Sequence, residues 1–61
     1  YGGGLVKVFI KWQDQFGYWK HYTMTHHLQN AYRSAKLRAK QTGKRHKLVD
    51  EDGTLLDLIE P

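Results

Sequence analysis

Residues 28–43, LQNAYRSAKLRAKQTG, decide the fold of this chain. Apolar residues recur there at the i, i+3, i+4, i+7 and i+11 spacing of a helix, namely Leu28, Ala31, Tyr32, Ala35 and Ala39. This spacing predicts one apolar stripe along a helix of about 3.6 residues per turn. Gly43 follows the last periodic residue, where a left-handed C-terminal cap is expected. Thr25 or Asn30 is the predicted N-terminal cap.

A first strand is predicted before the helix, at residues 5–12 (LVKVFIKW). The stretch is rich in β-branched and aromatic residues, and its side chains alternate in part between two faces. The faces carry Val6, Val8, Ile10 and Trp12 on one side and Lys7, Phe9 and Lys11 on the other. We expect the first set to pack under the helix and the second set to stay uncovered.

Residues 18–25 (YWKHYTMT) are the predicted return strand of a hairpin. The turn at 13–17 contains Asp14 and Gly17, which supply the usual turn chemistry. Two sets of side chains compete for the inner face of this strand, either Tyr18, Tyr22 and Met24 or Trp19, His21 and Thr23. We favour the first set because it offers more apolar area, which leaves Trp19 and His21 on the uncovered face.

A second hairpin is predicted after the helix, because residues 45–49 and 54–59 flank the sequence Asp50-Glu51-Asp52-Gly53. An Asp-Gly pair between two apolar strands is a strong hairpin signal. The expected fold is therefore α+β, a small ββαββ domain with one helix packed on one face of an antiparallel sheet. The order of the strands is left open. One helix covers only one face of such a sheet, so the other face meets water, a partner or a second copy of the chain.

The helix AYRSAKLRAKQTG and the hairpin KRHKLVDEDGTLLDLI together resemble small bacterial domains of uncharacterised function. In those domains an Ala-rich amphipathic helix ends in Gly and leads into an L-V-D-x-D-G hairpin. The resemblance implies the same hairpin–helix–hairpin order and carries no site residues. We expect residues 5–61 to form this single domain and residues 1–4 (YGGG) to be a cloning remnant or a disordered linker.

Charge is segregated along the chain. Residues 15–49 contain no carboxylate and hold eight of the ten Lys and Arg residues. By side-chain charge, residues 1–47 carry +9, with Asp14 as the one acid, and residues 48–61 carry −5, which gives the net +4. This separation concentrates a positive field in one region and makes a polyanion the first partner to consider.

The uncovered sheet face is the first candidate surface, because it interleaves basic and aromatic residues. Bases of a single-stranded nucleic acid can stack on Phe9 and Trp19, while Lys7 and Lys11 neutralise phosphates. His21 shares this face. Two alternatives stay open: the aromatic residues form a minor cluster shielded by lysine stems, or they make a dimer contact.

The helix edge and the loop after it form the second candidate surface, a basic run that could follow a phosphate backbone. The run comprises Arg33, Lys36, Arg38, Lys40, Lys44, Arg45 and Lys47. On the helix, Arg33, Lys36 and Lys40 gather on one flank of the apolar stripe, and Arg38 lies on the opposite flank. The alternative is an ordinary solvated helix face, since cations near a helix C-terminus interact favourably with the helix dipole. The acidic final hairpin could also pair with these cations internally.

Other functional classes find little support in the sequence. The absence of Cys excludes disulfides and thiolate sites and is consistent with an intracellular, cytoplasmic protein. No apolar run approaches the roughly 20 residues that span a bilayer. His26 and His27 are adjacent, so they do not chelate a metal as an i, i+4 pair would. We therefore predict no enzyme, cofactor, metal site, membrane contact or small-molecule substrate.

The leading prediction is a non-catalytic module that binds DNA or RNA through its basic, aromatic-bearing surfaces. The alternative is a protein-interaction or self-associating domain, in which the uncovered face forms a homodimer or meets another protein. In that case the acidic hairpin of one chain would meet the basic helix of the other.

Overall fold

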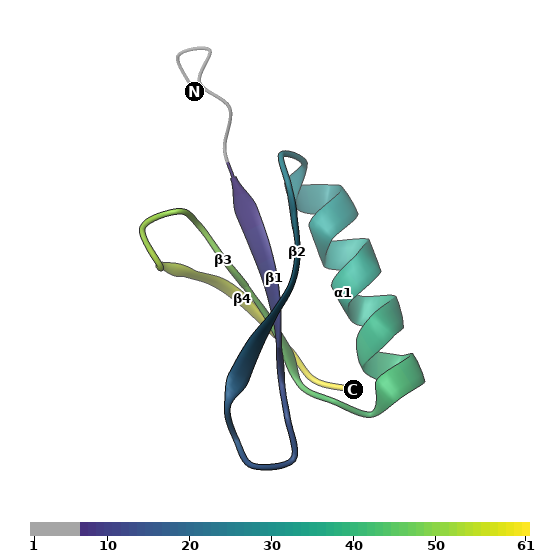
Figure 1. Ribbon diagram of the computed structural model, residues 1–61. Coiled ribbons are helices and arrows are strands. Elements are labelled where there is room, and N and C mark those ends of the chain that lie inside the picture. Colours follow the sequence, from purple (N-terminus) through teal and green to yellow (C-terminus); the bar gives the residue numbers. More distant parts are fainter. Residues whose placement is uncertain (1–6) are drawn as a thin grey trace, which may run out of the picture.

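Within residues 7–61, four antiparallel strands form one sheet in the order β2-β1-β3-β4, and a single helix packs on one face of it (Figure 1). The computed structural model describes residues 7–61. The elements are β1 (Val8–Gln13), β2 (Trp19–Thr25), α1 (Leu28–Thr42), β3 (His46–Val49) and β4 (Leu55–Ile59). The predicted α+β, ββαββ fold is confirmed. The predictions for residues 1–4 and for Leu5 and Val6 lie outside the described residues.

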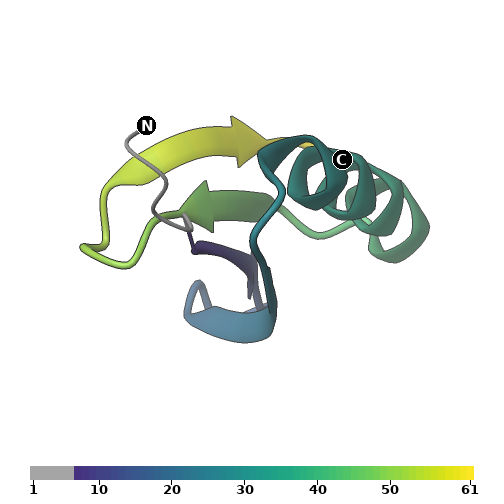
Figure 2. The ribbon, with the colours of Figure 1, turned by 90° about the horizontal axis from the view of Figure 1, so that it is seen from above.

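The core lies between α1 and the sheet. It consists of Val8, Ile10, Ala31, Ala35, Ala39, Leu48 and Ile59, all buried. The three alanines follow one another at every fourth position, so the helix presents a strip of small side chains to the strands. Their small size lets the helix backbone approach the sheet closely, and larger aliphatic side chains from the strands fill the space. Figure 2 shows α1 on one side of the sheet, with no described element on the other.

The two ends of α1 differ in how well the sequence predicted them. Gly43 has φ 69°, and its N–H donates to the Ala39 carbonyl at 2.9 Å, so the predicted left-handed cap is confirmed. At the other end the capping residue is His27, whose side chain makes no capping hydrogen bond. The prediction of Thr25 or Asn30 is therefore wrong. The Thr25 hydroxyl accepts a hydrogen bond from the His27 N–H at 3.2 Å, one step before the helix begins.

Both hairpin turns are built around an aspartate. Asp14 Oδ1 accepts hydrogen bonds from the backbone N–H groups of Phe16 and Tyr18, each at 2.9 Å. Asp50 Oδ1 accepts from Asp52 and Thr54 at the same distances. In each turn the aspartate carboxylate thus accepts hydrogen bonds from backbone N–H groups that have no backbone acceptor in a tight turn.

The facing of β2 departs from the prediction because the strand contains a bulge. The register with β1 shifts between Ile10 and Lys11, which leaves Tyr22 as the extra residue. On the N-terminal side of the bulge, Trp19 pairs with Gln13 and His21 pairs with Lys11, away from α1. Beyond it, Met24 pairs with Phe9 and Thr23 with the buried Ile10. Of the predicted inner set, Met24 is therefore on the wrong face, and Thr23 takes an inner position.

The bulged Tyr22 lies on the helix side. The Arg38 guanidinium stacks over its ring, 4.1 Å from the centroid. This contact joins the last turns of α1 to the edge strand β2. Tyr18, the remaining member of the predicted inner set, precedes β2 and is exposed.

Candidate nucleic-acid interface

The face of the sheet opposite α1, which we call the open face, carries a basic row across three strands. Lys11 on β1 pairs with His21 on β2 and with Lys47 on β3. Paired residues of antiparallel strands share a face and lie about 5 Å apart. The three side chains are therefore close neighbours. Lys7 precedes β1 and is exposed.

An apolar row lies beside the basic row, at the next positions along the strands that face the same way. Phe9 pairs with Met24 on one side and with Val49 on the other, and Val49 pairs with Leu55. The Phe9 and His21 rings are tilted by 59°, with centroids 6.1 Å apart. This separation is within the range of about 4.5–7 Å at which aromatic rings interact. The contact joins the apolar row to the basic row.

The Trp19 ring contacts the side chain of Lys47. The Lys47 ammonium lies 4.5 Å from the centroid of the Trp19 ring, within the range of a cation–π interaction. Trp19 and Lys47 are both half-buried. The sequence had assigned Lys47 to the basic run after the helix, and the structure places it instead on the open face, beside Phe9, Lys11, Trp19 and His21.

The remaining predicted basic residues lie elsewhere. Arg33, Lys36 and Lys40, which we call the helix flank, are exposed on α1. Lys36 lies 5.6 Å from the centroid of the Tyr32 ring on the same helix. The helix flank and the open face belong to different layers of the fold, so the structure does not bring all the predicted site residues together.

The loop between α1 and β3 holds the last two predicted cations. Arg45 Nε is 2.9 Å from Glu60 Oε1, and both side chains are about half exposed. Lys44 is half-buried, and its carbonyl oxygen is 2.9 Å from Nδ1 of the buried His46. Both residues precede β3 and therefore lie outside the strand itself.

Internal charge pairing is limited within residues 7–61. The ion pairs there join Arg45 to Glu60 and Lys20 to Asp14, the latter at 3.9 Å. The predicted pairing of the acidic hairpin with basic residues is thus found at Arg45, and not at the helix flank or at Lys11 and Lys47. Within residues 7–61 none of these latter cations has a carboxylate at ion-pair distance.

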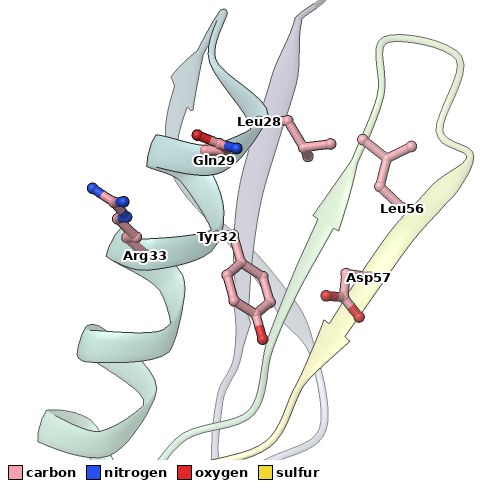
Figure 3. Close-up of a pocket in the computed structure, with 6 residues that line it drawn as sticks. All are labelled: Leu28, Gln29, Tyr32, Arg33, Leu56 and Asp57. Atoms are coloured by element: carbon pink, nitrogen blue, oxygen red, sulfur yellow. The ribbon is translucent and has the colours of Figure 1, made fainter.

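Depressions on the described surface include one on each side of the sheet. The first, of about 440 Å³, separates the start of α1 from β4, and Figure 3 shows Leu28 and Tyr32 extending from the helix toward Leu56 and Asp57. The second, of about 340 Å³, lies on the open face. Its lining residues are Phe9, Lys11, His21, Val49, Asp50, Glu51 and Gly53. Sequence reasoning identified the first three and missed the contribution of the β3–β4 turn, because that depends on β3 lying beside β1.

Metal and membrane sites receive no positive evidence from the described part of the chain. It contains no group of three or more His, Asp or Glu residues that could hold a metal ion. Its one helix is too short and too polar to cross a bilayer.

Comparisons of the chain with protein families, with curated proteins and with solved structures find no significant match. The resemblance to small bacterial domains therefore stays a prediction. The functional argument depends on the geometry of the open face.

Proposed function

We propose that this protein is a small non-catalytic module that binds single-stranded nucleic acid on the open face. One observation carries the proposal: the basic row of His21, Lys11 and Lys47 lies beside the Phe9–His21 ring contact, on the face opposite the helix. Single strands expose the faces of their bases, and these stack on aromatic side chains with little dependence on sequence. A duplex hides the same faces, so this surface favours single strands.

The lysines supply the electrostatic part of the binding. Lys11 and Lys47 are neighbours across β1 and β3, and neither has a carboxylate partner within residues 7–61. A cation that neutralises a phosphate releases a condensed counterion, which makes the affinity depend on salt. Contacts of this kind position the strand and carry no sequence information.

The helix flank plays a supporting role in this proposal. Its three cations add to the positive field that attracts a polyanion, without forming the stacking surface. The acidic residues of the second hairpin repel phosphates and so limit the path of the strand to the basic end of the open face. Since the role requires a compartment that contains nucleic acid, we propose that the protein is cytoplasmic, and the resemblance to small bacterial domains supports a bacterial source.

Fluorescence anisotropy titrations test the proposal, with labelled single-stranded and duplex DNA and RNA at about 50 and about 200 mM salt. We expect tighter binding to single strands, and an affinity that falls about tenfold between the two salt concentrations, as two or three phosphate contacts would give. Absence of binding to any of these nucleic acids at the lower salt concentration would refute the function. Equal affinity for single strands and duplexes would shift the site to the helix flank.

Phe9→Leu is the sharpest variant, because it removes the stacking ring and retains an apolar side chain beside Val49. It should weaken single-strand binding about fivefold or more, since one base–aromatic stack contributes about 1–3 kcal/mol. Phe16→Leu is the matched control: Phe16 lies in the β1–β2 turn, is 74% exposed and is not among the residues that line the depression on the open face. An equal loss in both variants would argue against a stacking role for Phe9.

A second candidate function is self-association, and the edge strand β4 favours it. Leu55 and Leu58 are 56% and 45% exposed, and one side of β4 has no strand partner among the described residues. Unpaired edge strands with apolar side chains are sites where another chain can add. The groove between α1 and β4 offers further apolar surface at Leu28, Tyr32 and Leu56.

Sedimentation equilibrium over a wide range of protein concentration separates the two candidates. A dimer that dissociates when charge is introduced at Leu55 would support self-association. A monomer at every concentration would refute self-association and leave nucleic-acid binding as the remaining candidate function.

A further inference from the structure

The depression on the open face has a composition that the proposed function does not by itself require. Phe9, His21 and Val49 contribute rings and an apolar side chain to its lining, and Lys11 adds a cation. The β3–β4 turn closes one end with Asp50, Glu51 and Gly53. A volume of about 340 Å³ is at the lower end of the range, roughly 300–1,000 Å³, that holds small organic ligands.

The two carboxylates of this turn that line the depression, Asp50 and Glu51, differ in their hydrogen bonding. Asp50 Oδ1 already accepts two backbone hydrogen bonds, from Asp52 and Thr54, and therefore fixes the shape of the turn. Glu51 is exposed and takes part in neither of the ion pairs within residues 7–61. It is thus a carboxylate with free acceptor positions in the lining of the depression.

An ionised carboxylate only accepts hydrogen bonds. A base stacked on Phe9 occupies the depression that Glu51 also lines. Cytosine has an exocyclic amino group that donates to such a carboxylate. Uracil and thymine carry a carbonyl oxygen at the same position, which the carboxylate repels.

We infer that the depression formed by Phe9, Lys11, His21 and Glu51 is a nucleobase subsite that prefers a base with an exocyclic amino group, and so takes cytosine over uracil. Phe9 supplies the stacking surface, Lys11 contacts the adjoining phosphate, and Glu51 reads the amino group. The inference rests on the proposed function and adds a base preference to it. Because cytosine and uracil are of similar size and shape, the preference isolates the contribution of the carboxylate.

The test compares fluorescein-labelled oligo(C) and oligo(U) of equal length by anisotropy, at low salt and at a mildly alkaline pH where cytosine is neutral. We expect the protein to bind oligo(C) about fivefold more tightly or better, at the lower end of what a base-edge contact provides. Glu51→Gln should bring the ratio close to one, because a carboxamide can also donate to the uracil carbonyl.

Asp52→Asn is the matched control. It removes the same charge from the same turn, and Asp52 is not among the residues that line the depression. Both variants lose a negative charge and should bind oligo(U) more tightly, while only Asp52→Asn keeps the preference for oligo(C). A ratio that is unchanged in Glu51→Gln, or that falls equally in the two variants, overturns the inference.

The two proposals fail in distinguishable ways. If the protein binds neither oligo(C) nor oligo(U) at low salt, the proposed function itself is wrong. If it binds both with equal affinity, nucleic-acid binding stands and the base preference is refuted.

Discussion

The Lys47 ammonium lies 4.5 Å from the centroid of the Trp19 ring, although β3 and β2 are not neighbours in the sheet. The lysine side chain therefore crosses over β1, beside Lys11, to reach the indole. An exposed cation–π contact contributes about 0.5–1 kcal/mol. This is a small contact, which a phosphate can displace, and it keeps a positive charge over the middle of the open face.

The first prediction concerns this charge. Lys47→Met retains an apolar stem over Trp19 and removes one phosphate contact. We expect weaker single-strand binding and a logarithmic salt dependence that is shallower by about 0.7, the contribution of one phosphate contact on a single strand. Titrations at four salt concentrations measure this slope. Lys40→Met, on the helix flank, is the control and should change the slope less; an equal change would show that the strand contacts both surfaces.

The second prediction concerns the turn that closes the depression. Asp50→Ala leaves the N–H groups of Asp52 and Thr54 without their protein acceptor. We expect the free energy of unfolding to fall by about 1–2 kcal/mol, as for the loss of a capping side chain. Asp50→Asn keeps an oxygen at the same position and should lie close to the parent protein. Urea denaturation followed by tryptophan fluorescence measures both, and equal losses would assign the effect to charge rather than to hydrogen bonding.

The third prediction concerns the C-terminal cap of α1. Gly43 has φ 69°, and a Cβ atom built there meets no heavy atom within 4 Å. Gly43→Ala should therefore lower the free energy of unfolding by about 1 kcal/mol through backbone strain alone. Gln41→Ala, at an exposed helical position, should change it by less than about 0.5 kcal/mol. Thermal or urea unfolding is the measurement, and an unaffected Gly43→Ala would mean that the helix end relaxes into another conformation.

The elements of the fold could be predicted because each depends on local sequence. The alanine spacing indicates the helix, and the turns at Gly17 and at Gly53 follow an aspartate at a fixed distance. The order of the strands could not be predicted, since either strand of each hairpin could occupy the centre. The bulge at Tyr22 escaped for a related reason: strict alternation placed Met24 inside, and one inserted residue moves the following side chains to the other face.

The part of the candidate site that lies on the first hairpin could also be predicted from local sequence. Alternation alone puts Phe9 and Lys11 on the face opposite Val8 and Ile10, and the hairpin adds His21. Lys47 and Glu51 join them because β3 pairs with β1, a contact between residues far apart in the sequence. The composition of the chain indicated a basic protein, but only the register of β3 against β1 shows which lysines are neighbours.

The fourth prediction sets the two candidate functions against each other at one position. Leu58 pairs with Lys47 and is 45% exposed on the open face. Leu58→Lys extends the basic row onto β4, so single-strand binding should become tighter and its salt dependence steeper by about 0.7. Leu37→Lys adds the same charge on the outer surface of α1, at a leucine that is 59% exposed, and should have a smaller effect. Sedimentation of the same two variants tests the alternative of self-association. If the leucines of β4 join two chains, Leu58→Lys dissociates a dimer that Leu37→Lys leaves intact. In that case Leu58→Lys should not improve binding to single strands.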